Sequence, residues 1–126
     1  MNNQNPKTTL VVGASENVNR YSNMAMKLLK VYGHPVLALG KQKGDVDGIP
    51  IETLSNCFEN SQIDTITLYL NPQNQIKYYQ ELINLKPKRV IFNPGTENEE
   101  FEQKLRDNNI ETEEACTLVL LRSGQF

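Results

Sequence analysis

The clearest chemistry in this sequence lies in a polar loop between an apolar run and an amphipathic segment. The loop reads Gly13-Ala14-Ser15-Glu16-Asn17-Val18-Asn19-Arg20-Tyr21-Ser22. A helix that begins after such a loop offers unpaired N–H donors and a partial positive charge, and both attract phosphate. Gly13 permits close approach of the backbone, and the Arg20 guanidinium can hold phosphate oxygens in a bidentate fork. We therefore predict a phosphate site with further hydrogen-bonding groups from Ser15, Asn17 and Ser22.

The same loop also has a purely structural interpretation. It matches neither the G-x-G-x-x-G fingerprint nor a Walker P-loop. An ordinary strand-to-helix loop, with Ser22 as the helix cap, would have a similar sequence. The combination of loop, helix start and arginine favours phosphate binding but leaves this alternative open.

A second polar segment follows the next apolar run. It reads Gly40-Lys41-Gln42-Lys43, at a place where an NAD site usually carries an acid that bonds the ribose hydroxyls. Lysines there tolerate a phosphorylated ribose, so the segment favours NADP or coenzyme A over NAD. The alternative is a solvated loop in which the lysines balance Asp45 and Asp47.

Two Asn-Pro turns follow later apolar runs, Asn71-Pro72 and Asn93-Pro94-Gly95-Thr96. Each can present backbone polar groups to a ligand, and each also suits an ordinary turn from strand to helix. We expect the second turn to face the ligand crevice. For the first turn, which would flank the crevice, the structural interpretation carries more weight.

Candidates for catalysis are few. His34 is the only histidine, and it lies between Gly33 and Pro35, at the wrong end of the predicted sheet for a ligand crevice. A Ser-His-Asp triad and a multi-histidine metal site are therefore excluded. Cys116 could be a reactive thiol, although a buried small apolar side chain is its more usual role. Tyr69, Tyr78 and Tyr79 are interpreted as packing residues. We expect no catalytic residue and no metal.

Alternating strands and helices would position these residues. Apolar runs predict strands at residues 8–12, 36–39, 64–70 and 89–92 and a weak strand from residue 110, while residues 49–51 look extended. Between these strands, apolar residues spaced three and four apart predict helices. Tyr21 and Met24 are expected on the buried face of the first helix, and Thr96 is expected to cap a later one. The alternation predicts an α/β fold, a single Rossmann-like, doubly wound parallel sheet of about five strands. The expected order is 3-2-1-4-5, with helices on both faces and a ligand crevice between the first and fourth strands. The tail, residues 115–121, suits either a strand or a short helix.

Length and composition narrow the class of protein. The 126 residues suit one domain at residues 7–126, after a flexible N-terminus at residues 1–6. With 13 basic and 15 acidic side chains and a net charge of -2, the chain is not suited to coating nucleic acid. Cys57 and Cys116 form neither a disulfide framework nor a zinc motif. The sequence has no signal peptide and no apolar stretch of roughly 20 residues, so we expect a cytoplasmic protein that does not enter a membrane.

Beyond this chemistry, the first loop resembles that of a known family. The segment Val11-Val12-Gly13-Ala14-Ser15, followed by Asn17, Arg20, Tyr21 and Ser22, is similar to the small stand-alone CoA-binding proteins. These in turn look like the N-terminal nucleotide-binding domain of the succinyl-CoA synthetase α subunit. The resemblance extends over residues 7–126 and includes residues 69–72, 92–98 and 114–118.

The resemblance implies a Rossmann-like domain that binds coenzyme A, and it assigns site residues. The nucleotide phosphates would contact Gly13, Ala14, Ser15, Arg20 and Ser22, with Asn17 and Tyr21 in the same loop. The adenosine end would lie near Gly40 and Lys41. The path toward the pantetheine arm would be lined by Asn71, Pro72, Asn93, Pro94 and Gly95.

The sequence departs from the family in two ways. Val18 stands where many members have a proline, which should loosen the loop slightly. The second domain of the synthetases, with its phosphorylated histidine, is not part of these residues, so acyl-CoA synthesis is not implied.

Three functions therefore stand as hypotheses. The leading one is a module that binds coenzyme A or an acyl-CoA and has no catalysis of its own. The rivals are a fragment of an NADP-dependent oxidoreductase and a protein-interaction domain that has lost its ligand. The fold alone does not decide among them. A protein partner, and whether the chain is a monomer or a homodimer, stay open.

Overall fold

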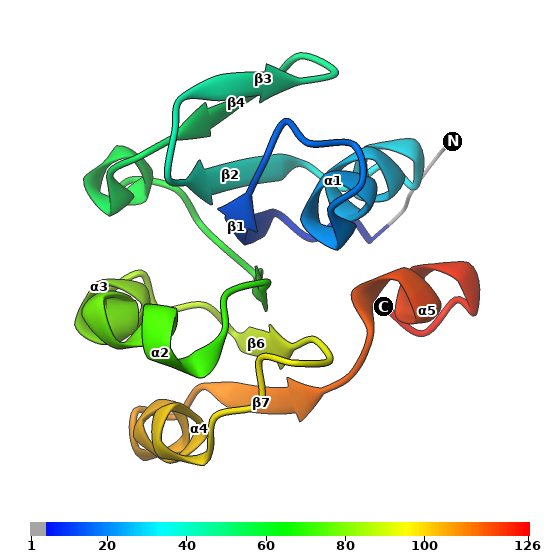
Figure 1. The fold of residues 1–126 in the computed structure, drawn as a ribbon. Coiled ribbons are helices and arrows are strands. Elements are labelled where there is room, and N and C mark those ends of the chain that lie inside the picture. Colours follow the sequence, from blue (N-terminus) through cyan, green and yellow to red (C-terminus); the bar gives the residue numbers. More distant parts are fainter. Residues whose placement is uncertain (1–4) are drawn as a thin grey trace.

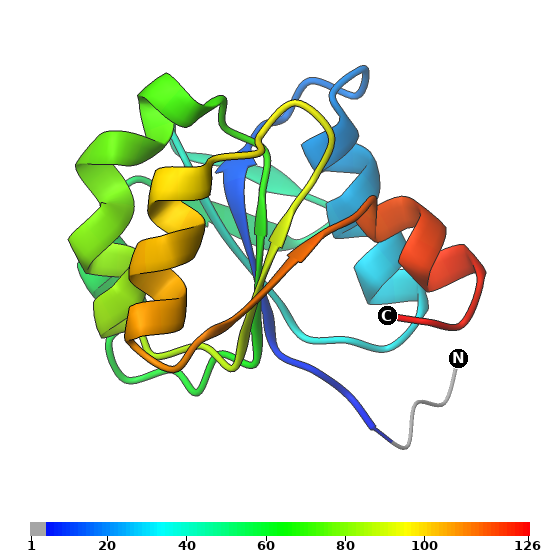
Figure 2. The ribbon, with the colours of Figure 1, turned by 90° about the horizontal axis from the view of Figure 1, so that it is seen from below.

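The computed structural model describes residues 5–126, which form a seven-stranded sheet between two layers of helices (Figure 1). The strands are β1 (Thr9–Ala14), β2 (Val36–Gly40), β3 (Gly44–Val46), β4 (Ile49–Glu52), β5 (Thr65–Leu68), β6 (Arg89–Phe92) and β7 (Glu111–Glu114). The helices are α1 (Tyr21–Val31), α2 (Pro72–Gln75), α3 (Tyr79–Asn84), α4 (Glu99–Asp107) and α5 (Thr117–Arg122), with 3-10 turns η1 (Ser55–Phe58) and η2 (Ile76–Tyr78). Figure 2 shows α1 and α5 on one face of the sheet and α2, α3 and α4 on the other.

The predicted fold class is confirmed, but the number of strands is not. The strand order is β3-β4-β2-β1-β5-β6-β7. All neighbours pair in parallel except β3 and β4. The sheet is doubly wound with helices on both faces, as alternating strands and helices dictate. The expectation of about five strands is wrong, because residues 44–52 add a hairpin at one edge.

The predicted order also assigned one strand to the wrong neighbour. β4, expected only as an extended segment, pairs with β2 through Ala38 and Ile51. β5, expected beside the second strand, pairs with β1 instead, with Leu10 opposite Ile66. The order 3-2-1-4-5 holds only when β4 is counted as the third strand. The strand that adjoins β1 at the crevice is therefore β5, and the loop after β5 is the near wall.

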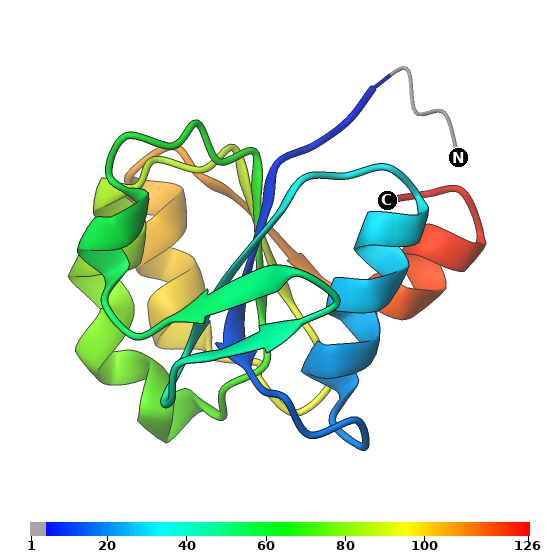
Figure 3. The same ribbon diagram turned by 90° about the horizontal axis from the view of Figure 1, so that it is seen from above.

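The hairpin of β3 and β4 carries a turn signal that the sequence analysis did not use (Figure 3). Asp47 and Gly48 both have positive φ, 51° and 86°. Such a pair is typical of the type I′ turn, for which Asp-Gly between apolar residues is a strong sequence signal. Asp45 Oδ1 also accepts a hydrogen bond from the Gly48 amide at 2.9 Å. Part of the charged stretch before Ile49, Gly44–Val46, is thus an edge strand and not a loop.

Two apolar clusters hold the layers together, one on each face of the sheet. The first joins β1, β5 and β6 to α3 and α4, and it includes Leu10, Val12, Leu68, Phe92, Phe101 and Leu105. The second joins β1, β2 and β4 to α1 and α5, and it includes Val11, Met26, Leu29, Ala38, Ile51 and Leu121. Successive residues of β1 alternate between the clusters, which explains its continuous apolar run.

The helices differ from the sequence predictions in several details. Tyr21 and Met24 are 69% and 38% exposed, and the buried face of α1 is formed by Ser22, Asn23, Ala25, Met26 and Leu29. The cap of α4 is Asn98, whose Oδ1 accepts from the Phe101 amide at 3.1 Å, and not Thr96. Asn71 caps α2 as expected, accepting from the Asn74 amide at 2.9 Å. The tail, left open by the sequence, forms α5.

His34 lies at the end of the sheet that the sequence predicted for it. It is 9% exposed, and its Nδ1 accepts a hydrogen bond from the Lys7 amide at 2.9 Å. Burial lowers the pKa of this imidazole, with smaller contributions in the same direction from Lys7 and Arg89. Of the predicted flexible N-terminus, residues 1–4 lie outside the described residues. No helix in residues 5–126 has the length and apolar character needed to cross a membrane.

Candidate functional site

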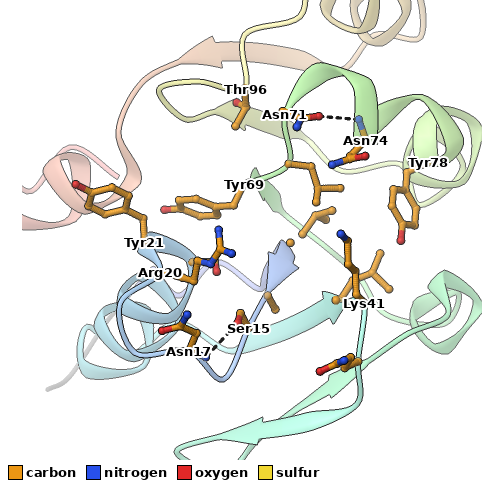
Figure 4. Close-up of a pocket in the computed structure, with 18 of the residues that line it drawn as sticks. Ser15, Asn17, Arg20, Tyr21, Lys41, Tyr69, Asn71, Asn74, Tyr78 and Thr96 are labelled. Carbon is orange, nitrogen blue, oxygen red and sulfur yellow. Dashed lines mark hydrogen bonds between the residues drawn. The ribbon is translucent and has the colours of Figure 1, made fainter.

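A cavity of about 730 Å³ lies at the carboxyl ends of the central strands (Figure 4). This volume is within the range of roughly 300–1,000 Å³ that is typical of small-molecule sites. The loops after β1, β2, β5 and β6 contribute to its wall. Of the predicted site residues, the wall contains Gly13, Ala14, Ser15, Asn17, Arg20, Tyr21, Ser22, Gly40, Lys41, Asn71, Pro94 and Gly95.

The loop after β1 holds its shape through its own polar groups. Ser15 Oγ accepts a hydrogen bond from the Asn17 amide at 3.0 Å, and Asn17 Oδ1 accepts from the Asn19 amide at 2.9 Å. The Asn17 carbonyl accepts from the Arg20 amide at 3.0 Å. These side chains therefore form local turns of the kind that Ser and Asn favour, and the amides of residues 17, 19 and 20 are already used.

The first turn of α1 keeps donors for a ligand. Arg20 is the residue before the helix, and no side chain caps the helix start. Within residues 5–126, the amides of Asn23 and Met24 donate to the Arg20 carbonyl, while those of Tyr21 and Ser22 donate to no protein group. The Arg20 guanidinium forms no ion pair or hydrogen bond within this part of the chain, and Figure 4 shows it extending toward Tyr69. Free amides beside a free guanidinium suit an anion.

Glycines bring the backbone of three strands close together at this edge. Gly13 has φ +94°, and a Cβ added there would lie 3.1 Å from the Tyr69 carbonyl carbon. A Cβ added at Gly40 would approach the carbonyl oxygen of Ala14 more closely than any real side chain does. Larger residues at either position would push the β1 loop away from β2 or β5.

The loop after β1 is also joined to the turn between β2 and β3. Glu16 Oε2 accepts a hydrogen bond from the Asp45 amide at 3.0 Å. Gly44 leaves room for this contact, since a Cβ added there would lie 2.5 Å from the Glu16 carboxyl carbon. The same turn carries Lys41 and Lys43, which both line the cavity.

Two predicted site residues, Pro72 and Asn93, do not line the cavity. Asn93 is 2% exposed, and its Nδ2 donates to Thr67 Oγ1 at 2.7 Å and to the Leu68 carbonyl at 2.8 Å. Its Oδ1 accepts from the Thr117 amide at 2.9 Å. Asn93 thus ties β6 to β5 and to the start of α5, and both N–H donors of its side chain are used within the protein.

Several wall residues were not among the predicted site residues: Val12, Glu16, Leu39, Gln42, Lys43, Tyr69, Leu70, Asn74, Lys77, Tyr78 and Thr96. The group from Tyr69 to Tyr78 follows β5, and it was missed because the misplaced strand order kept that segment at the flank. Tyr69 was interpreted as a packing residue, and its ring is partly buried. Burial raises the pKa of the Tyr69 phenol to about 12. The hydroxyl, which is protonated at neutral pH even at its ordinary pKa, can donate a hydrogen bond.

The wall is strongly cationic compared with the rest of the chain. It contains Arg20, Lys41, Lys43 and Lys77 but a single carboxylate, Glu16, in a chain whose net charge is -2. Within residues 5–126, His, Cys, Asp and Glu side chains form no group of three or more that could hold a metal ion. The charge of the wall suits an anionic ligand.

A doubly wound parallel sheet with a ligand-sized cavity beyond the carboxyl ends of its central strands is the architecture of Rossmann-like nucleotide-binding domains. Within that class, the family model described as the CoA binding domain matches residues 7–122. The chain belongs to this family. No curated protein matches the chain.

Solved structures with the same fold include one close relative. An uncharacterized protein is 48% identical, with a TM-score of 0.92, over 98% of this chain and 100% of that chain. A Thermus thermophilus protein, cell-free ID.343, is 22% identical with a TM-score of 0.84, over 96% of this chain and 91% of its own. A Candidatus Korarchaeum cryptofilum acetyl-coenzyme A synthetase is 17% identical with a TM-score of 0.69, over 86% of this chain and 25% of its own. The last two show the fold alone.

Proposed function

We propose that residues 7–126 form one domain that binds coenzyme A or an acyl-CoA in this cavity and has no catalysis of its own. The observation that carries the proposal is the free amides of Tyr21 and Ser22 beside four cationic side chains and one carboxylate. The family membership of the chain supports the same ligand. Such a role suits the cytoplasm, where we place the protein.

The amount of positive charge favours a ligand with more than a diphosphate. Coenzyme A carries a diphosphate and a third phosphate on its ribose, and a phosphate monoester adds a charge of about -2 near neutral pH. NAD has the diphosphate alone. The diphosphate is proposed to bind at Arg20 and the first turn of α1, and the third phosphate near Lys41.

A panel of ligands tests the proposal by thermal unfolding. A ligand that binds only the native state raises the melting temperature, and about 2.7 kcal/mol of stabilisation is expected at a hundred times Kd. We expect a clear rise with coenzyme A and with acetyl-CoA, a smaller rise with dephospho-CoA and little with NAD. A larger rise with NADP would favour the oxidoreductase fragment. No rise with any nucleotide would favour an interaction domain.

The substitution Arg20→Ala tests the anion site directly. We expect coenzyme A binding to weaken by about 1.5 kcal/mol, roughly tenfold in Kd, the lower end of the range for hydrogen bonds to charged groups because Arg20 is exposed. Titration calorimetry gives the value, and Arg122→Ala, an exposed arginine that does not line the cavity, is the matched control. An unchanged Kd in Arg20→Ala would remove Arg20 from the site.

A further inference from the structure

We infer that the η2 turn is a second recognition element, in which Lys77 binds the third phosphate of the ligand and Tyr78 stacks on its base. The inference rests on the proposed function and extends it to specificity. It starts from three wall residues spaced three apart along the chain, Asn71, Asn74 and Lys77.

The interruption of the helix aligns this spacing more closely with one cavity than a continuous α-helix would. In an α-helix, residues three apart drift around the axis, whereas in a 3-10 helix they are aligned. Here α2 ends at Gln75, and η2 follows over Ile76–Tyr78 before α3 begins. The change to three residues per turn keeps Lys77 on the side of Asn74, with Tyr78 next to it in the wall.

A buried amide fixes this orientation. Gln75 is fully buried, and its Nε2 donates to the carbonyls of Leu70 and Thr96, both at 2.8 Å. Its Oε1 accepts from Asn98 Nδ2 at 3.0 Å. Because Gln75 is anchored inward between two loops, the residues that follow it are held at a set angle toward the cavity.

Lysines from two different elements lie on the side of the cavity wall near the Tyr78 ring. Lys41 comes from the loop after β2, and Figure 4 shows its ammonium extending toward Asn74 and Tyr78. Lys77 forms no ion pair within residues 5–126. Its Nζ lies 5.2 Å from the centre of the Tyr78 ring, within the range of a cation–π contact. A phosphate monoester with a charge of about -2 is suited to pairing with two lysines.

The Tyr78 ring supplies the apolar part of the same element. It is partly buried, packs against the cluster under α3 and α4, and still lines the cavity. Stacking of a base on an aromatic ring is worth about 1–3 kcal/mol. Of these two residues, only Lys77 carries a charge that can pair with the third phosphate, so its loss should affect only a ligand that has that phosphate.

The test measures Kd by titration calorimetry for coenzyme A and dephospho-CoA in the same variants. We expect Lys77→Gln to weaken coenzyme A binding roughly tenfold and to leave dephospho-CoA unchanged. Tyr78→Ala should weaken both ligands by a similar factor of roughly ten. Lys104→Gln, an exposed lysine of α4 outside the cavity wall, is the matched control and should change neither.

Any other result would contradict one specific part of the inference. If Lys77→Gln weakens the binding of both ligands equally, or of neither, Lys77 does not recognise the third phosphate. The proposed function would still stand in that case, provided that the wild-type chain binds coenzyme A. If Tyr78→Ala weakens only coenzyme A, or neither ligand, the stacking role is wrong. If the wild-type chain binds neither ligand, the proposed function itself fails and the inference falls with it.

Discussion

The variant Gly40→Ala is expected to lose about 3 kcal/mol in the free energy of unfolding and to bind coenzyme A at least tenfold more weakly. The new methyl group would meet the Ala14 carbonyl oxygen, which is backbone and has no rotamer through which to move away. Relief requires β1 and β2 to separate at their carboxyl ends, and that displaces the loop with Ser15 and Arg20. Stability and binding should therefore fall together.

Denaturant unfolding and calorimetry with coenzyme A measure the two effects. Gly124→Ala is the control, because Gly124 has φ +74° but no neighbour within 4 Å of an added Cβ. It should lose about 1–2 kcal/mol from backbone strain alone and retain the wild-type Kd. A Gly40→Ala protein with the unfolding midpoint of the wild type would show that the strands accommodate the methyl group, contrary to the close packing described.

The variant Asn93→Ala is expected to lose about 3 kcal/mol, because it removes three buried hydrogen bonds at once. The Leu68 carbonyl and the Thr117 amide would lose their partner on Asn93. The start of α5 should then open more often, so hydrogen exchange at the Thr117 amide should accelerate more than exchange in β1.

The control for this variant is an amide on the surface. Asn84→Ala removes a side chain that accepts one exposed hydrogen bond from Gln80, and its stability should stay within about 0.5 kcal/mol of the wild type. If Asn93→Ala were as stable as Asn84→Ala, the bonds of Asn93 would not hold β6 to α5. A ligand role for Asn93 would then have to be considered again.

The contrast between the two Asn-Pro turns shows what local sequence can predict. Both turns follow strands, and both were expected near the crevice. The side chain of Asn93, however, turns inward to Thr67 and Thr117, which are distant in the chain. Asn71 lies in the cavity wall as well as capping α2. Which way a polar side chain points after a strand depends on its partners in space, and no local pattern records that.

The fold was predicted better than the site for the same reason. Apolar runs identify β1, β2, β5 and β6 because these strands are buried on both faces. β3 has three residues and a charged centre at Asp45, so it has no such run, and only the Asp47-Gly48 turn marks it. Lys77 and Tyr78 reach the cavity because Gln75 is anchored to Leu70 and Thr96. That anchor is a tertiary contact, and the sequence around residue 77 carries no sign of it.

The two outer strands of the sheet also bear on how copies of the chain can meet. β7 carries Glu111, Glu113 and Glu114 along one border, and β3 is a short antiparallel strand at the other. Acidic side chains along a border strand, or a very short one, discourage the backbone pairing by which sheets fuse into larger assemblies. If copies of this protein associate, the borders of the sheet therefore favour contact through the helical layers over pairing of the strands.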